Sequence, residues 1–260
     1  MEIFANLVYA FLTWFDTYSA AILYALGIPS IILSCIFATL FVAGADIRLK
    51  PELTLVKRKF ELNIRTALII FFTTFTVWIF RIAYSFMISF LWGPGTAGID
   101  TLTWIMYFIF PVVFGVPGIW GIFLGSILIN LSLGLPGILG SIANLTCGWI
   151  FWRTYGQDTS LKTKRSWCNF LFSVFIVYFL WYNLHWSTTV ILSGIMPKGF
   201  YADLILSNIF QMVPWILFYP AVVYMLENMA KKHELHWTNF ENKQSCLDKR
   251  KINNLNLKSH

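Results

Sequence analysis

The chain has 260 residues, of which 58% are hydrophobic, 18% aromatic and only 12% charged, and its mean hydropathy is +0.67. Soluble domains carry about 25% charged residues, so this composition excludes a soluble enzyme, a disordered chain and a disulfide framework. It predicts an all-α integral membrane protein, a polytopic helical bundle with room for about six to eight spans of about 20 residues each.

The formal net charge of +7 comes from clusters that favour membrane topology over nucleic-acid binding. Six of the 19 Lys and Arg lie at 48–65, four at 153–165 and seven at 231–258. Loops rich in Lys and Arg face the cytoplasm. We therefore expect a multi-pass protein of the cell membrane with a cytoplasmic C-terminus, the lipid bilayer as its surroundings and no nucleic-acid partner.

The first apolar stretch, Ile3 to Gly44, is too long for one helix, and Gly27–Ser30 predicts a break in it. In one arrangement Ile3–Leu26 and Ile31–Ala45 form a membrane hairpin. In the other, the first part carries Asp16 along the interface and a single helix crosses. We favour the hairpin, which gives seven or eight spans in all.

Six spans are expected after the first basic loop. The connections at Gly115–Gly118 and Gly134–Gly137 are so short that the helices they join are antiparallel neighbours. The expected spans are Asn63–Trp92, Leu102–Val116, Ile119–Leu131, Leu135–Trp152, Trp167–Trp186 and Leu204–Leu226. Starting inside at 57–59, they return both later basic segments to the cytoplasm. The chain then divides into an N-terminal hairpin at 1–46, a basic loop at 47–62, a six-helix core at 63–227 and a basic, disordered tail at 228–260.

Arg81 is a charged residue within an apolar predicted helix, outside the three basic clusters. It lies 16 residues after Arg65 on the same predicted helix, a rise of roughly 24 Å. A charge at such depth costs at least about 2.5 kcal/mol, so it should face the bundle or a wet cavity. Either it binds an anionic ligand, or it pairs with Asp100 or reaches the outer headgroups. Asp16 either pairs with Arg81 or points to water.

Small and amide side chains recur at helical spacing in the middle of the chain. Glycines three or four residues apart let two helix backbones approach closely. The predicted packing residues are Gly121, Gly125, Gly140, Asn144 and Gly148. Asn130 and Asn144 go beyond pure packing, because an amide can bridge helices or contact a solute.

Aromatic and amide residues gather near the predicted outer ends of the helices. Each Trp alone is typical of an interfacial belt, yet an aromatic, amide-lined cleft would suit a planar polar ligand. The candidate binding residues are Arg81, Trp92, Trp104, Asn183, Asn208 and Gln211. His185 is expected to be a hydrogen-bonded interface residue.

The motifs of enzymes are missing from the sequence. It holds no HExxH, no GxSxG and no GxxxxGK[ST], which argues against a metalloprotease, a serine hydrolase and an ATPase. The four cysteines have no CxxC spacing. We therefore expect no catalytic residue, no metal and no cofactor, while an unrecognised membrane enzyme stays a third alternative.

The segment Phe110–Tyr155 resembles two membrane families. With the last helix, Gly199–Lys232, it is similar to the substrate-binding S component of energy-coupling-factor transporters, over about 62–232. Its "PGIWGIFLGSILINL" also resembles the membrane-associated sensor domains of bacterial signalling proteins. Both likenesses consist of Gly, Pro and apolar positions. The predicted helix after residue 63 lacks the small-residue face of S components, and the 33-residue tail has no room for an output domain.

The first resemblance implies a solute-binding subunit of an uptake transporter, of the vitamin or micronutrient class. Such a subunit takes its solute from the outer side and works with energy-coupling membrane and ATPase subunits. The second implies a membrane sensor or scaffold without transport. Residues and resemblance together favour the first, with Arg81 as the anchor of an anionic or planar solute.

Overall fold

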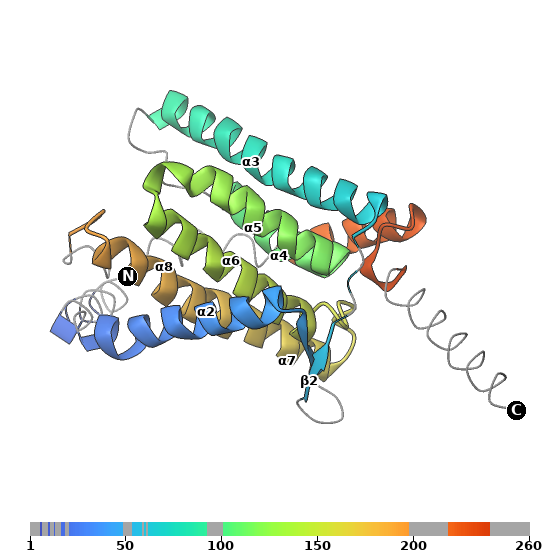
Figure 1. Cartoon of the computed structure of the whole chain (residues 1–260), viewed down its shortest axis with the longest axis horizontal. Helices are drawn as coiled ribbons and strands as arrows, with labels where there is room; N and C mark the ends of the chain where they lie inside the picture. The colour runs from blue at the N-terminus through green and yellow to red at the C-terminus, as the bar shows by residue number, and fades with distance from the viewer. Residues whose placement is uncertain are drawn as a thin grey trace, which may run out of the picture.

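The computed structural model describes residues 21–48, 54–58, 60, 62–92, 101–197 and 218–239, with 6, 10, 13, 17 and 18. The elements in chain order are η1 (Leu23–Gly27), α2 (Ile28–Val42), β1 (Ala45–Arg48), β2 (Thr54–Lys57), α3 (Ile64–Trp92), α4 (Thr101–Phe114), α5 (Val116–Asn130), η3 (Leu131–Leu133), α6 (Leu135–Thr154), α7 (Lys164–Phe172), η4 (Ser173–Tyr182) and α8 (Asn183–Leu192). A further helix covers 218–232. Figure 1 shows them as a bundle of long helices.

Five helices of the described part are long and apolar enough to cross a membrane, which indicates a membrane protein. They are Leu23–Val42, Ile64–Met87, Val116–Leu133, Leu135–Thr154 and Lys164–Leu192. The expected helical class is thus found, but not the count of seven or eight spans. α4 has 14 residues, a rise of about 21 Å, which is short of a bilayer core of about 30 Å. Most of the predicted last span lies outside the described residues.

The N-terminal region differs from the predicted break at Gly27–Ser30. The chain stays helical there, because η1 is a wide π turn that leads directly into α2. Pro29 lies in the first turn of α2, where its missing N–H is tolerated, and Ser30 Oγ donates to Gly27 O at 2.6 Å. Leu23–Val42 is therefore one continuous helix that is long and apolar enough to cross a membrane. Most of the other predicted arm of the hairpin, with Asp16, lies outside the described residues.

Two glycines make the tight connections around α5. Gly115 has a φ of +62° and Gly134 a φ of +64°, which is the left-handed region that favours glycine. Pro117 and Pro136 follow each glycine by two residues, in the first turn of α5 and α6. The short connections lie where the sequence predicts them, and α4, α5 and α6 are packed neighbours.

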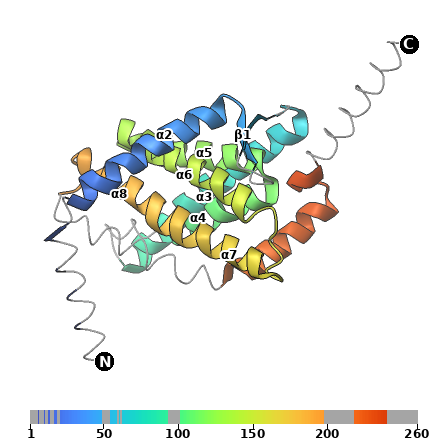
Figure 2. The same ribbon diagram turned by 90° about the horizontal axis from the view of Figure 1, so that it is seen from below.

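α6 is the central helix of the bundle. It is the most buried of the five candidate spans, and it contacts α2, α4, α5, η4 and α8. Figure 2 shows these neighbours around it. Its large side chains Trp149, Phe151 and Trp152 are almost fully buried, so α6 supplies much of the core against which the candidate sites are built.

One end of the bundle collects the basic residues. Arg65 at the start of α3 pairs with Glu234 at 3.3 Å, and Arg153 at the end of α6 pairs with Asp46. The antiparallel hairpin of β1 and β2, in which Asp46 lies opposite Val56, sits at the same end (Figure 1). We call this the basic end, and the opposite end, with η3, the η3 end.

The tail begins as folded chain, unlike the expected disordered segment from 228. The last helix runs to 232. After it, Trp237 packs edge-on against Trp152 with ring centroids 5.8 Å apart, and its Cβ lies 2.8 Å from the position a Cβ on Gly115 would take. Residues 240–260 lie outside the described part.

Candidate functional site

A cavity of about 590 Å³ opens between α3, α5 and η3 at the η3 end. Its walls come from Trp78, Arg81, Ile82, Ser85 and Phe86 of α3, Leu128, Ile129 and Asn130 of α5, and Ser132 and Leu133 of η3. The volume lies within the range of about 300–1,000 Å³ that is usual for small-molecule sites. Of the predicted binding residues whose side chains the structure describes, Arg81 is among these walls and Asn183 is not.

The glycines of α5 explain why the cavity lies where it does. A Cβ on Gly121 would collide with Thr73 Oγ1, and one on Gly125 would lie 2.9 Å from Val77 Cβ and 3.0 Å from Thr74 O. α3 and α5 therefore touch closely along these two residues, and Thr74 Oγ1 donates to Gly121 O at 3.3 Å. One turn further on, α5 carries Leu128 and Ile129 instead of glycine, and both residues line the cavity.

The cavity combines one cation and a few hydroxyl and amide groups with apolar walls. The polar contributors are Arg81, Ser85, Asn130 and Ser132. Trp78, Phe86 and Leu128 supply apolar surface. Such a lining suits a small molecule that carries a negative charge beside an apolar part, because the guanidinium offers charge-assisted hydrogen bonds.

A chain of hydrogen bonds leads from the cavity wall into the bundle. Asn130 Nδ2 donates to Ser126 Oγ at 3.3 Å, and Asn144 Nδ2 donates to the same oxygen at 2.8 Å. Ser126 in turn donates to Ser141 at 3.0 Å. Asn144 Oδ1 is buried and has no hydrogen-bond partner within the described residues. Asn144 thus bridges α6 and α5, whereas Asn130 bonds within α5 to the same serine.

The remaining predicted packing residues touch other helices. A Cβ on Gly140 would collide with the indole of Trp186 on α8. One on Gly148 would lie 2.8 Å from Ile122 Cδ1 on α5 and 3.2 Å from Pro111 Cγ on α4. Gly140 and Gly148 of α6 therefore admit side chains of neighbouring helices, whereas Gly121 and Gly125 of α5 lie against both side chains and backbone carbonyls of α3.

Asn183 lies away from the cavity, fully buried at the start of α8. Its Nδ2 donates to Phe179 O at 2.9 Å and to Tyr178 O at 3.4 Å. These carbonyls belong to the last wide turn of η4, so the amide stabilises the return from π to α geometry. Nearby, His185 Nε2 lies 2.9 Å from Leu139 O on α6.

The other predicted binding residues cannot be placed against the cavity. Trp92 is the last residue of α3 and Trp104 lies in α4, but their side chains are outside the described part, as are Asn208 and Gln211 altogether. The structure instead adds Trp78, Ser85, Asn130 and Ser132 to Arg81. Of these, Asn130 had a signal in the sequence, because it is an amide within an apolar helix. Whether the other three residues face the cavity depends on how α3 and α5 are rotated, which the sequence does not show.

The basic end holds a buried ion pair that sequence reasoning missed. Arg153 Nε donates to Asp46 Oδ1 at 2.7 Å and Arg153 Nη2 donates to Asp46 Oδ2, while Trp149 Nε1 donates to Oδ1 at 3.3 Å. The two side chains are only 12% and 9% exposed. Asp46 therefore ties the hairpin to the end of α6.

Glu227 forms a second polar contact at this end. It accepts a hydrogen bond from Thr159 Oγ1 at 2.9 Å, and His236 Nε2 lies 3.5 Å and Lys231 Nζ 3.3 Å from its carboxylate oxygens. Burial alone would raise the pKa of Glu227, but the hydrogen bonds from His236 and Thr159 and the charge of Lys231 outweigh it and lower this pKa below 4.5.

Comparison with protein-family models, with curated proteins and with solved structures finds no match for the chain. The comparisons therefore identify neither of the two families that the sequence resembles. Within the described residues, no group of three or more His, Cys, Asp and Glu is placed to hold a metal ion. What can be inferred about function rests on the geometry of the chain itself.

Proposed function

We propose that the chain is a multi-pass membrane protein, with its basic end and C-terminus in the cytoplasm, that captures a small anionic solute from the outer side. The observation that carries this proposal is the place of Arg81 in the wall of the 590 Å³ cavity. A guanidinium within an apolar helix is costly unless it serves a partner or ligand. The polar groups beside it, Ser85, Asn130 and Ser132, would orient such a ligand.

The basic clusters support the orientation. Arg58, Arg65 and Arg153 lie at the basic end, and positively charged loops face the cytoplasm. The Arg81 cavity then opens toward the outer half of the membrane. The resemblance to S components would make the chain the binding subunit of an uptake transporter, which hands its solute to energy-coupling membrane and ATPase subunits.

The test begins with the small molecules that accompany the purified full-length protein. Mass spectrometry of molecules released on denaturation should show an anionic compound with the wild type that is reduced at least about tenfold in Arg81→Gln, because a charge-assisted hydrogen bond contributes about 1.5–3 kcal/mol. Arg65→Gln is the matched control, since it removes the same charge from the same helix outside the cavity. An anionic compound retained equally by Arg81→Gln would refute the proposed site.

Partners decide between uptake and sensing. If the chain belongs to a transporter, it should co-purify with ATPase subunits, and cells should accumulate the identified compound only with those subunits present. Binding of the compound without accumulation, together with a signalling partner, would instead establish the sensor alternative. Turnover of the compound by the protein alone would establish an enzyme.

A further inference from the structure

A second cavity, of about 430 Å³, lies at the basic end on the same side of the bundle as the first. It is bounded by the end of α2, the segment after β2, α3 and α5. Its walls are Val42, Gly44, Arg58, Phe60, Leu62, Ile70, Trp120 and Leu124. Of the residues that the structure describes in these walls, Arg58 carries the charge.

Arg58 is held firmly in this wall. Its backbone N–H donates to Gly44 O at 2.5 Å, and its Nη2 donates to Phe41 O at 2.5 Å. The guanidinium carbon lies 3.9 Å from the centroid of the Phe41 ring, a cation–π contact. These contacts fix the position of the cation before any ligand arrives.

Two of the three nitrogen atoms of the Arg58 guanidinium make no hydrogen bond within the described residues. Nε and Nη1 are buried and have no hydrogen-bond partner within the described residues. Burial lowers the pKa of Arg58 to about 10, with Asp46 opposing this shift and Arg153 adding to it. Unpaired donors on a partly desolvated cation are costly, and an anion in the cavity would compensate the charge of the guanidinium.

The rest of the cavity is apolar and opens beside a surface suited to lipid. Ile70, Trp120 and Leu124 form part of its apolar wall. On α3 next to it, Ile64 and Leu68 are 83% and 62% exposed, as expected for side chains that face acyl chains. An anionic group and an apolar tail would therefore both find a matching surface.

We propose that this cavity binds a phospholipid with an anionic headgroup from the leaflet at the basic end. The headgroup phosphate pairs with the charge of the Arg58 guanidinium, and an acyl chain lies along Ile70, Trp120 and Leu124. Charge complementarity selects anionic over zwitterionic lipid, as in basic pockets between membrane helices. This site uses a different arginine from the proposed solute site and lies at the other end of α3.

The fluorescence of Trp120, a residue of the cavity wall, reports which lipid lies beside it. The full-length protein is reconstituted in mixtures of brominated phosphatidylglycerol or brominated phosphatidylcholine with unlabelled lipid, and bromine quenches a nearby indole. The contribution of Trp120 is the difference between each protein and its Trp120→Phe counterpart. We expect phosphatidylglycerol to bind near Trp120 at least about fivefold more tightly than phosphatidylcholine, the ratio for one basic residue.

The ratio of phosphatidylglycerol binding to phosphatidylcholine binding near Trp120 should fall to about one in Arg58→Gln. It should stay at the wild-type value in Lys57→Gln, which removes the same charge from an exposed neighbour outside the cavity. Leu124→Phe, which fills the cavity and leaves Arg58 in place, should also abolish the preference for phosphatidylglycerol. This variant tests the proposal if Arg58→Gln does not fold. Equal quenching by both lipids in the wild type, or an unchanged preference in Arg58→Gln or Leu124→Phe, would overturn the proposal.

Discussion

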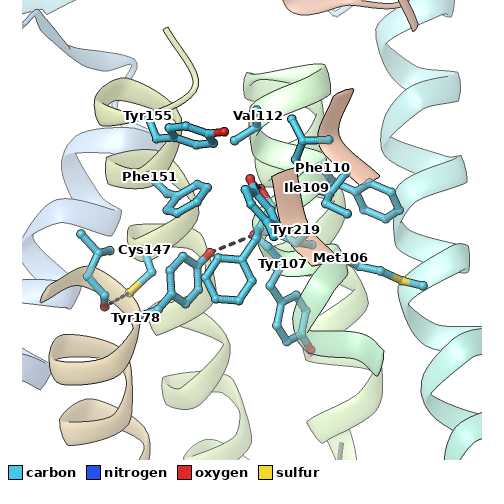
Figure 3. Close-up of a cluster of buried hydrophobic side chains, with 14 of the residues drawn as sticks. Met106, Tyr107, Ile109, Phe110, Val112, Cys147, Phe151, Tyr155, Tyr178 and Tyr219 are labelled. Carbon is cyan, nitrogen blue, oxygen red and sulfur yellow. Dashed lines mark hydrogen bonds between the residues drawn. The ribbon is translucent and has the colours of Figure 1, made fainter. Parts of the chain in front are cut away.

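The hydroxyl of Tyr178 in η4 donates a hydrogen bond of 2.8 Å to the carbonyl oxygen of Tyr107 in α4 (Figure 3). Pro111 lies inside α4, and because proline has no N–H it cannot supply the helical bond to this carbonyl four residues earlier. Tyr219 donates in the same way to the next carbonyl, Phe108 O, at 3.2 Å. Two tyrosine hydroxyls thus donate hydrogen bonds to backbone carbonyl oxygens of α4 near the proline. In apolar surroundings such carbonyls need a donor from within the protein.

Tyr178→Phe is therefore expected to destabilise the chain although it removes a single oxygen. The Tyr107 carbonyl would stay buried without this donor, which costs about 1–3 kcal/mol. Thermal unfolding of the detergent-purified protein measures the loss. Tyr224→Phe, on an exposed tyrosine of the last helix, should leave the midpoint unchanged, and an equal shift in both variants would contradict the assigned role.

Asp46→Asn should be more costly, because it leaves Arg153 buried without its counter-charge. Breaking a buried pair costs about 3–5 kcal/mol, whereas an exposed pair is worth at most about 1 kcal/mol. Glu234→Gln, which breaks the exposed pair with Arg65, is the matched control in the same unfolding measurement. Similar shifts in the two variants would mean that the Asp46 pair is not buried as described.

Acid should weaken the fold through Glu227. Its pKa is lower in the folded chain than the ordinary 4.5, so its carboxylate stabilises the folded chain above pH 4.5, and this contribution is lost as the pH falls below that value. The difference in stability between the wild type and Glu227→Gln should stay constant from neutral pH to about 4.5 and then shrink. A difference that stays the same in more acidic solution would count against the lowered pKa.

Gly125→Ala tests the contact of α5 with α3. The added methyl group would lie 2.9 Å from Val77 Cβ and 3.0 Å from the Thr74 carbonyl oxygen, so the helices must separate, at a cost of about 1–3 kcal/mol. Leu128→Ala, on a half-exposed residue of the same helix, is the control in thermal unfolding. If Gly125→Ala is as stable as the wild type, the close approach is not needed.

Local patterns in the sequence predict the apolar helices and the turns at Gly115 and Gly134, because glycine and a following proline act within a few residues. They do not predict the pairing of Asp46 with Arg153, which are 107 residues apart. The helix break predicted at Pro29 is wrong for a related reason. The wide π turn before Pro29 lets the helix continue through this residue. The spacing of Arg81 from Arg65 predicts its depth in the membrane, but the residues that lie opposite it depend on helix rotation and could not be predicted.

The wide turns of η4 have a consequence for the length of the chain. A π turn holds more residues than an α turn, so deleting one residue from Ser173–Tyr182 would allow ordinary α geometry there. Such a deletion would leave the rotation of the helix after η4 nearly unchanged, with His185 and Trp186 still against Leu139 and Gly140 of α6. The same deletion in a regular α-helix would turn everything after it by about 100°, so the wide turns let the chain carry a surplus residue without changing the direction in which α8 faces.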